Sequence, residues 1–392
     1  MPAIITHIIL TLTQQKLQAL LDKPFTIPVV IDNDTFPNST PYQQINTLNQ
    51  AGFTFTAREL LHAIGSKTAA LPANNQDECV NAAFLYSHIL DFSGQNLGYK
   101  TDLVMDSDLQ TNRSNEIGIG IGCLLVNKQF NVNWDTLESI KGQGKRFDYR
   151  ATNVGQNYAY EFKGTKHRGK QNEQVQNGLE KKTEMHDRNE NYDVELIIST
   201  FLGPANQQPR IILADPPFQG FEDEFTEDAE TIYSLRHLSR LAQFIGNPPL
   251  GRILYMQSRE LIEKKNIDQI QELGERLYLK EIRVIENLFE TKKLIPLNFE
   301  NTNYVGRWIS YWQPQRKLTR KQVFEMPEIA ANKRLEVFQG VRRDLYELMT
   351  NNEITDLKSK LRYERTKIQT PENIEFMTFT DGSIMGYRLL DV

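Results

Sequence analysis

The spacing of apolar and polar residues changes twice along the chain and divides it into three regions. In the first, residues 1–105, helix-like and strand-like patterns are mixed. The apolar spacing of TARELLHAIGS (56–66) predicts a helix with Thr56 as its N-cap and an end near Gly65, and FTIPVVID (25–32) predicts a strand. We therefore expect an N-terminal accessory region of α/β type.

In the second region, residues 106–215, strand and helix patterns alternate. SNEIGIGIGCLLVNKQF predicts a helix, RFDYRATNVGQNYAYEFKG predicts a hairpin, and a polar segment suited to a second helix comes next. DVELIIST and RIILA are then almost continuously apolar, as expected of strands that helices cover on both faces. Strands, a helix and buried strands in this order indicate an α/β domain.

The third region, residues 216–392, begins with two prolines and an acidic stretch. Six of the ten residues from 221 to 230 are acidic, which marks a boundary. Most of the remaining residues have helical spacing, including RLEVFQGVRRDLYELMTN (334–351), so we expect a mostly helical accessory or recognition region. The end of the chain predicts a hairpin, with Asp381-Gly382 as its turn.

Composition excludes several classes of site. The 392 residues are 39% hydrophobic, enough for a sizeable core, and their net charge of -5 still permits a local basic surface that binds nucleic acid. Only Cys79 and Cys123 are present, and no histidine pair has HExxH spacing, so neither a disulfide framework nor a zinc site of these types is expected.

The apolar N-terminal run is short and lacks a preceding Lys or Arg, and no 18-residue apolar span occurs. We expect a cytoplasmic protein without a membrane partner.

The predicted hairpin brings two acids and a lysine together. With Gly155-Gln156 as a two-residue turn, Asp148 lies across from Lys163. Side chains alternate between the faces of a strand, so Glu161 and Lys163 share a face, and this register adds Asp148 to it. A slip of one residue would move Asp148 to the opposite face.

Such a cluster suits metal-assisted hydrolysis of a phosphodiester. Carboxylate oxygens hold Mg²⁺ (or Mn²⁺), which keeps some of its waters and takes an oxygen of the substrate phosphate. The ion polarises the phosphate and helps to generate hydroxide from bound water. A nearby lysine can stabilise the negative charge that develops.

These residues carry a resemblance to a known family. FDYR…YEFKG resembles the D…(D/E)xK pattern of the PD-(D/E)XK nuclease superfamily, over about residues 106–215. The resemblance implies a restriction-endonuclease-like core, a mixed central sheet flanked by helices. It implies that Asp148 and Glu161 bind the metal, that Lys163 is the catalytic lysine, and that Glu116 supplies a further catalytic and metal-binding acid. Phe147 stands where the family pattern has proline, which is often absent in relatives.

Basic residues downstream of the motif predict contacts with nucleic acid. Lys166, Arg168 and Lys170 are placed to neutralise phosphates next to the cluster. The resemblance implies that Gln171 or Gln174 matches a glutamine on the helix after the hairpin in one subset of the family. A plain solvated helix would show the same spacing.

Purely structural roles also explain several of these residues. Glu116 can be an ordinary acid near the start of a helix, where the helix dipole favours it. The glycines at 118, 120 and 122 imitate a phosphate-binding loop, but GxGxG is not GxGxxG, and close helix packing explains them better. The segment GRWISYWQPQRKLTRKQ (306–322) can grip a single strand by stacking and charge, or can be buried aromatics beside a solvated loop.

From the sequence we expect a metal-dependent nuclease, acting on DNA in preference to RNA, in restriction or phage defence. A homo-oligomer or a partner from a defence system is compatible with this. One alternative is a non-catalytic nucleic-acid-binding or scaffold subunit that keeps the fold. A weaker one is a DNA amino-methyltransferase, suggested by DPPF (215–218), whose candidate glycine-rich strand lies too close upstream.

Overall fold

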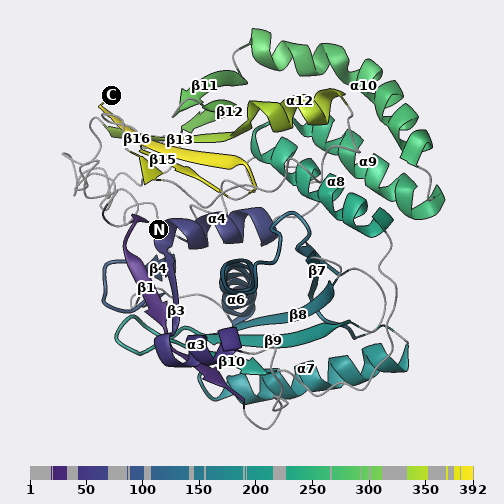
Figure 1. Ribbon diagram of the computed structural model, residues 1–392. Helices are drawn as coiled ribbons and strands as arrows, with labels where there is room; N and C mark the ends of the chain where they lie inside the picture. Colours follow the sequence, from purple (N-terminus) through teal and green to yellow (C-terminus); the bar gives the residue numbers. More distant parts are fainter. Residues whose placement is uncertain are drawn as a thin grey trace. The chain divides into compact units, whose positions relative to one another are not determined.

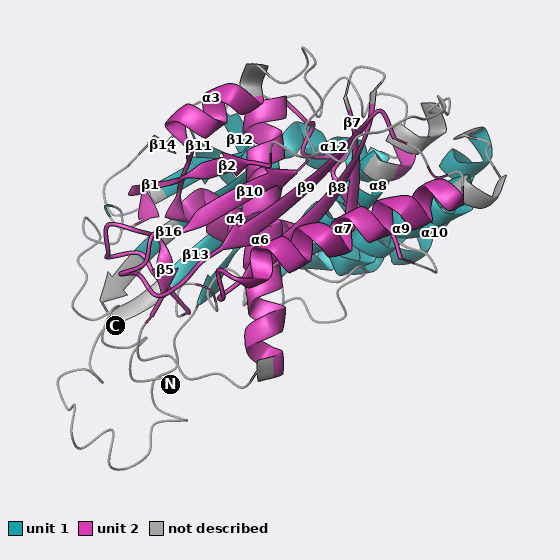
Figure 2. Ribbon diagram, turned by 90° about the horizontal axis from the view of Figure 1, so that it is seen from below, with its two compact units in different colours: residues 1–20, 71–76, 234–392 teal, residues 21–70, 77–233 magenta. Residues whose placement is uncertain are grey.

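The computed structural model describes most of the chain in two compact units (Figure 2), residues 21–70 with 77–233, and residues 1–20 and 71–76 with 234–392. The residues described are 19, 21–32, 43–68, 86, 89–100, 107–140, 145–153, 156–188, 190, 192–214, 227–264, 267–291, 293–299, 302–310, 333–351, 368–369, 375–379 and 381–391. We call the unit built around residues 107–214 the sheet unit, and the other the C-terminal unit.

The sheet unit is built on a mixed six-stranded sheet. Its strand order is β2-β10-β9-β8-β7-β6, in which β8 and β9 are parallel, β10 and β2 are parallel, and the other neighbours are antiparallel. The strands are β2 (Val29–Ile31), β6 (Glu138–Ser139), β7 (Tyr149–Asn153), β8 (Gln156–Thr165), β9 (Val194–Phe201) and β10 (Arg210–Ala214). The predicted α/β class is confirmed. Strand β2 comes from the segment predicted as an N-terminal accessory region, yet it belongs to this sheet.

Two long helices cover opposite faces of the sheet (Figure 1): α6 (Ser107–Phe130) on one and α7 (Lys170–Asp187) on the other. α4 (Ala57–Thr68) packs on the outer side of α6, where a Cβ at Gly120 would meet Ile64 at 2.5 Å. The predicted cap of α4 is confirmed, because Thr56 and Glu59 exchange hydrogen bonds as a capping box. The helix ends at Thr68 rather than near Gly65. The smaller elements of this unit are β1 (Pro24–Ile27), α3 (Gln43–Ala51), β3 (Phe53–Thr56), β4 (Leu90–Asp91) and β5 (Gly98–Tyr99).

The register of the hairpin differs from the prediction by two residues. Strand β7 pairs with β8 so that Asn153 lies opposite Gln156, and Gln156 is therefore the first residue of β8, not part of a turn. Continued by one pair, this register places Asp148 opposite Glu161 instead of Lys163. Because side chains repeat every two residues along a strand, a slip of two leaves Asp148 on the predicted face.

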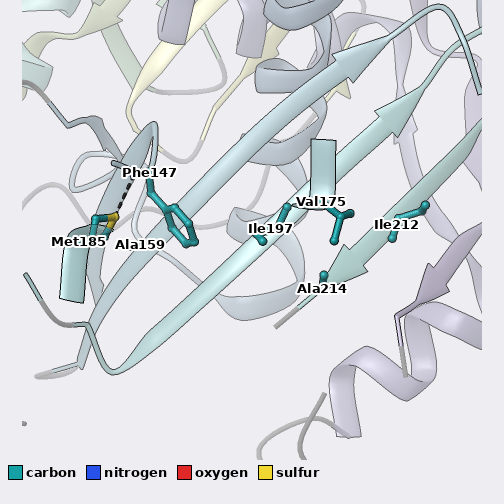
Figure 3. Packing of buried hydrophobic residues seen from close by; sticks show 7 residues of the cluster. All are labelled: Phe147, Ala159, Val175, Met185, Ile197, Ile212 and Ala214. Atoms are coloured by element: carbon teal, nitrogen blue, oxygen red, sulfur yellow. Dashed lines mark hydrogen bonds between the residues drawn. The ribbon is translucent and has the colours of Figure 1, made fainter. Parts of the chain in front are cut away.

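An apolar core lies between α7 and the sheet (Figure 3). Phe147 and Met185 close one end of it, and the backbone N–H of Phe147 points to the Met185 sulfur at 3.0 Å. The cluster consists of Phe147, Ala159, Val175, Met185, Ile197, Ile212 and Ala214, all of them buried. This core fixes the position of α7 on the strands that carry the predicted motif.

The C-terminal unit contains a six-stranded antiparallel sheet, of which the sequence predicted only the closing hairpin. Its strand order is β11-β12-β13-β16-β15-β14. The strands are β11 (Ile295–Phe299), β12 (Thr302–Ser310), β13 (Lys333–Arg342), β14 (Ile368–Gln369), β15 (Glu375–Thr378) and β16 (Ser383–Asp391), and the helices are α8 (Glu227–Phe244), α9 (Pro248–Lys264), α10 (Ile267–Glu290) and α12 (Arg343–Asn351). The expectation of a helix over 334–351 is thus wrong for its first half, which is the central strand β13.

The closing hairpin of this unit and its basic aromatic segment were also expected from the sequence. The hairpin is confirmed, with Gly382 at a φ of +76° and the Asp381 carboxylate accepting hydrogen bonds from Ser383. Trp308 packs against Phe338, and the Arg388 guanidinium lies 3.9 Å from the centre of the Trp308 ring. Trp308 is therefore part of the packing of this unit. Residues 311–322 of the basic aromatic segment lie outside the described residues. No helix in the described part of the chain has the length and apolar character to cross a bilayer.

Candidate active site

Four charged side chains meet on the α7 face of the sheet. The Lys163 ammonium lies 2.8 Å from Oδ2 of Asp148 and 2.9 Å from Oε1 of Glu161. The Lys181 ammonium lies 3.2 Å from Oδ1 of Asp148 and 2.7 Å from the same Oε1 of Glu161. Each lysine therefore bridges both carboxylates. We call these four residues the charged cluster.

The strands and α7 together dictate this convergence. Phe162 points to α6, where a Cβ at Gly122 would meet its ring at 2.4 Å. Its neighbours Glu161 and Lys163 must then point to the other face, toward α7. Lys181 extends from α7 itself, and Asp148 directly precedes β7.

Glu161 is the buried centre of the cluster. Its side chain is fully buried; Oε1 accepts from Lys181, and Oε2 has no hydrogen-bond partner. Burial raises the pKa of this carboxyl and the charge of Asp148 raises it further, against the opposing effect of the two lysines. Burial alone would lower the pKa of the Lys163 ammonium, but Glu161 and Asp148 outweigh it and hold that pKa above its usual range.

The cluster fits a magnesium ion through two carboxylates. Mg²⁺ is commonly held by one or two carboxylates and otherwise by water and substrate phosphate. Asp148 and Glu161 supply that donor set, and the unpartnered, buried Oε2 of Glu161 is an acceptor that a cation or its water would satisfy. Within the described residues, no group of three or more His, Cys, Asp or Glu side chains is arranged to hold a metal.

Glu116 does not belong to the cluster, contrary to the prediction. α6 contacts β8 through Ser114 and Gly118, since a Cβ at Gly164 would lie 1.8 Å from the Ser114 carbonyl oxygen. Residue 116 is about 160° around the helix from both of those positions. α6 also covers the face of the sheet opposite the cluster. Glu116 instead forms an ion pair with Arg113 at 2.7 Å, and burial raises its pKa to about 7.

The two glutamines predicted to contact nucleic acid are engaged inside the protein. Gln171 is fully buried, and its amide donates to the carbonyl oxygens of Ser199 and Arg210. Gln174 is half-buried; it donates to the Gly164 carbonyl and accepts from the Ser199 hydroxyl. The burial of Gln171 is incompatible with a direct contact, whereas the half-buried Gln174 already has one partner at Nε2 and one at Oε1.

The predicted basic residues lie at the surface where β8 gives way to α7. Arg168 and Lys170 are exposed, and the Lys166 ammonium lies 5.5 Å from the ring centre of Tyr99. Their predicted contact with phosphates stays a prediction, and their positions are compatible with it.

The lysine that completes the cluster was only partly visible in the sequence. Lys181 and Lys182 both fall at helical spacing after Gln171, and either could have been chosen from the spacing alone. Lys182 is buried, and its ammonium lies 2.8 Å from Oε2 of Glu195 on β9. The same carboxylate also accepts a hydrogen bond from His186. Only the packing of α7 on β8 and β9 separates these roles.

The motif that suggested a methyltransferase is largely outside the described residues. Of LADPPF, Leu213 and Ala214 end β10, and 215–218 are not described. Residues 199–206 run from β9 toward β10, its antiparallel neighbour, with no helix between the two strands. A glycine-rich cofactor loop of the strand-to-helix type is therefore not found there.

Comparisons with family models, with curated proteins and with solved structures find no match to this chain. Any function assigned to the chain therefore depends on the geometry of the charged cluster and on its surroundings.

Proposed function

We propose that this protein is a Mg²⁺-dependent nuclease that hydrolyses phosphodiester bonds, in DNA in preference to RNA. The observation that carries the proposal is the convergence of Asp148, Glu161 and Lys163 within ion-pair distance on one face of the hairpin. Two acids and a lysine from an Asp…ExK pattern are the groups that such a reaction requires. Mn²⁺ can replace Mg²⁺ at a site of this kind.

The order of the elements supports a restriction-endonuclease-like core. A helix, a strand preceded by Asp148, a strand carrying Glu161 and Lys163, a helix and two apolar strands follow one another as α6, β7, β8, α7, β9 and β10. This is also the order of elements that the sequence predicts for residues 106–215. Restriction or phage defence, in the cytoplasm and with a defence-system partner or a second copy, is the setting that this resemblance favours.

The chain's own residues supply charge and position in the proposed reaction. Asp148 and Glu161 would hold the ion, which would polarise the scissile phosphate and lower the pKa of an attacking water. Lys163, kept cationic by both acids, would place positive charge where negative charge develops on the phosphate. Glu161 is anchored by burial, so the site is preorganised at its centre.

One observation favours the non-catalytic alternative. With Lys181 as the second ammonium group, the cluster contains two acids and two lysines, and its net charge is zero without any metal. Such a balanced cluster can also serve simply to hold α7 on the sheet. A nucleic-acid-binding or scaffold subunit with this fold is therefore the second candidate.

Cleavage of plasmid, single-stranded DNA and RNA in Mg²⁺, Mn²⁺ or EDTA separates the two. Asp148→Asn and Lys163→Ala should each lower the metal-dependent rate by about 10²–10³-fold. Lys145→Ala is the control, because Lys145 is exposed and pairs with Glu180 and Glu184 rather than with the acids of the cluster. Cleavage that persists in both cluster variants would overturn the proposed site, and binding of nucleic acid without cleavage would favour the alternative.

A further inference from the structure

Two arginines at the start of α7 and β10 are joined through one buried glutamine. Nε of Arg210 donates to Oε1 of Gln171 at 2.9 Å. The backbone N–H of Gln171 donates to the Arg168 carbonyl at 3.3 Å. The side chain of one arginine and the backbone of the other are thus attached to the same residue.

Gln171 uses its whole amide to orient this arrangement. It is fully buried, its Nε2 donates to the carbonyls of Ser199 and Arg210, and its Oε1 accepts from the Arg210 side chain. A buried amide that is satisfied at both ends has one orientation. Arg210 is consequently held in one direction at the rim of the sheet, although its side chain is only half-buried.

Lys166, Arg168, Lys170 and Arg210 form what we call the rim, and its charge is not neutralised by the residues that the structure describes. Among the described residues, no carboxylate lies within ion-pair distance of Arg168, Arg210, Lys166 or Lys170. By contrast, the basic residues of the charged cluster and those at or beside the C-terminal end of α7 pair with acids: Lys163, Lys181, Lys182, Arg188 and Lys145. Burial and the nearby charge of Arg168 lower the pKa of Arg210, as expected of two cations kept close together. The acid in the first turn of α7, Glu173, is exposed.

The rim lies beside the charged cluster on the same face of the sheet. Ser199, to which Gln171 donates, is the strand partner of Lys163. Gln174 connects the same serine to Gly164, the residue after Lys163. A polyanion bound at the rim would therefore continue toward the cluster.

We infer that Arg168 and Arg210 form a phosphate-binding site for the backbone of a nucleic acid, with Gln171 as the residue that positions Arg210. Lys166 and Lys170 extend the same positive surface. The inference rests on the proposed function only for the identity of the polymer, since the arginines themselves would recognise phosphodiester groups of any sequence.

Binding to labelled single-stranded DNA, duplex DNA and RNA tests it, by fluorescence anisotropy in EDTA at several salt concentrations. Arg168→Ala and Arg210→Ala should each weaken binding several-fold, and the double variant should lower the slope of log affinity against log salt by about two, one per lost phosphate contact. Arg188→Ala removes the same charge from the far end of α7, where Arg188 is paired with Glu190, and should leave the slope unchanged. A double variant that behaves like Arg188→Ala overturns the site.

The positioning role has its own test. Arg210→Lys keeps the charge but loses the planar Nε donor to Gln171, so it should weaken binding with little change in salt slope. Gln171→Met should have the same effect, and Arg210→Lys decides the matter if Gln171→Met does not fold. Wild-type affinity in Arg210→Lys would overturn the positioning role.

All binding is measured in a Lys163→Ala background as well, which separates this inference from the nuclease proposal. Arginine-dependent binding without cleavage by the wild type leaves the phosphate site standing and removes the nuclease. Cleavage by the wild type with no dependence of binding on either arginine does the reverse.

Discussion

The balance between two carboxylates and two ammonium groups decides what single residues of the charged cluster can do. Lys163 and Lys181 contact the same pair of acids, but they come from different elements and differ in what fixes them. Lys163 lies on a strand in the middle of the sheet, whereas Lys181 reaches in from α7. A metal ion between the acids would be repelled by both lysines. Lys181, on the helix, is the lysine that can be removed without altering the Asp…ExK pattern.

Replacing Lys181 should therefore strengthen metal binding. Lys181→Gln removes a positive charge about 3 Å from both acids, and one charge at such distance is worth a few kcal/mol at the effective dielectric near a protein surface. We expect the affinity for Mn²⁺, measured by electron paramagnetic resonance, to rise by about tenfold or more. Lys145→Gln is the control with an exposed lysine. Equal Mn²⁺ affinity in wild type and Lys181→Gln would mean that Lys181 does not compete with the ion.

Glu116 gives a prediction about pH that is independent of the cluster. Burial raises its pKa from 4.5 to about 7 in the folded protein. The unfolded chain therefore loses the Glu116 proton first, and stability that is full below about pH 4.5 is lost as the pH rises toward 7. Glu116→Gln, which cannot ionise, should gain stability relative to wild type across that interval.

The measurement is the free energy of unfolding of both proteins in urea over this pH range. The difference should stay below about 3 kcal/mol, because the side chain is partly exposed and pairs with Arg113. A difference that shrinks with rising pH would show that Arg113 outweighs burial.

For single residues, prediction from the sequence succeeded where a period of two was sufficient. Asp148, Glu161 and Lys163 were placed on one face although the register was two residues off, because an even slip preserves the face. It failed for Glu116 and Gln171, whose helices were predicted correctly. Which side of a helix meets the sheet is set by tertiary packing, and the glycine contacts of α6 and the burial of Gln171 are not encoded in local spacing.

Among the secondary-structure elements, α6 crosses β8 at a point where neither has room for a side chain. A Cβ at Gly118 would lie 2.4 Å from the Gly164 nitrogen, and one at Gly164 would lie 1.8 Å from the Ser114 carbonyl oxygen. Close backbone contact explains why glycine occupies these positions. It also fixes the position of Gly164, and with it that of the neighbouring Lys163, relative to α6.

Gly164→Ala should consequently destabilise the protein by about 3 kcal/mol or more, since backbone must move to admit the methyl group. Gly169→Ala is the matched control: it precedes α7 at a helical φ of -65°, and nothing lies within 4 Å of the added Cβ. We expect its free energy of unfolding in urea to differ from wild type by less than about 1 kcal/mol. Similar losses in both variants would contradict the close crossing.

Elements were predicted well where periodicity had one interpretation. The helix, hairpin, helix and two apolar strands of residues 107–214 were all expected, and so was the N-cap of α4 at Thr56. β13 was missed because Val337, Phe338 and Val341 are buried on both faces of the strand together with the polar Gln339, so the sequence there shows no alternation of apolar and polar residues. A short apolar run buried on both sides is equally compatible with a helix, and α12, which comes directly after it, extended the helical pattern.

Taken as a complete domain, the sheet unit is larger than the core that the motif suggested. β2 pairs with β10 at the edge of the sheet, from Ile211 opposite Val29 to Leu213 opposite Ile31. α4 covers the outer side of α6 through Leu60 and Ile64. Both elements come before the predicted domain boundary at residue 105, so the sheet unit includes part of the predicted accessory region.

Fragments of the chain can show whether these elements are required for folding. A fragment of residues 106–215 would expose the apolar outer side of α6 and leave β10 as an unpaired edge, which favours aggregation. A fragment of residues 21–233 retains both partners. We expect the longer fragment to unfold cooperatively on heating, followed by circular dichroism and one-dimensional NMR, and the shorter one to aggregate or lack a cooperative transition. Independent folding of 106–215 would show instead that α4 and β2 merely decorate a core that is complete without them, and the charged cluster would then have to keep its geometry on the smaller scaffold.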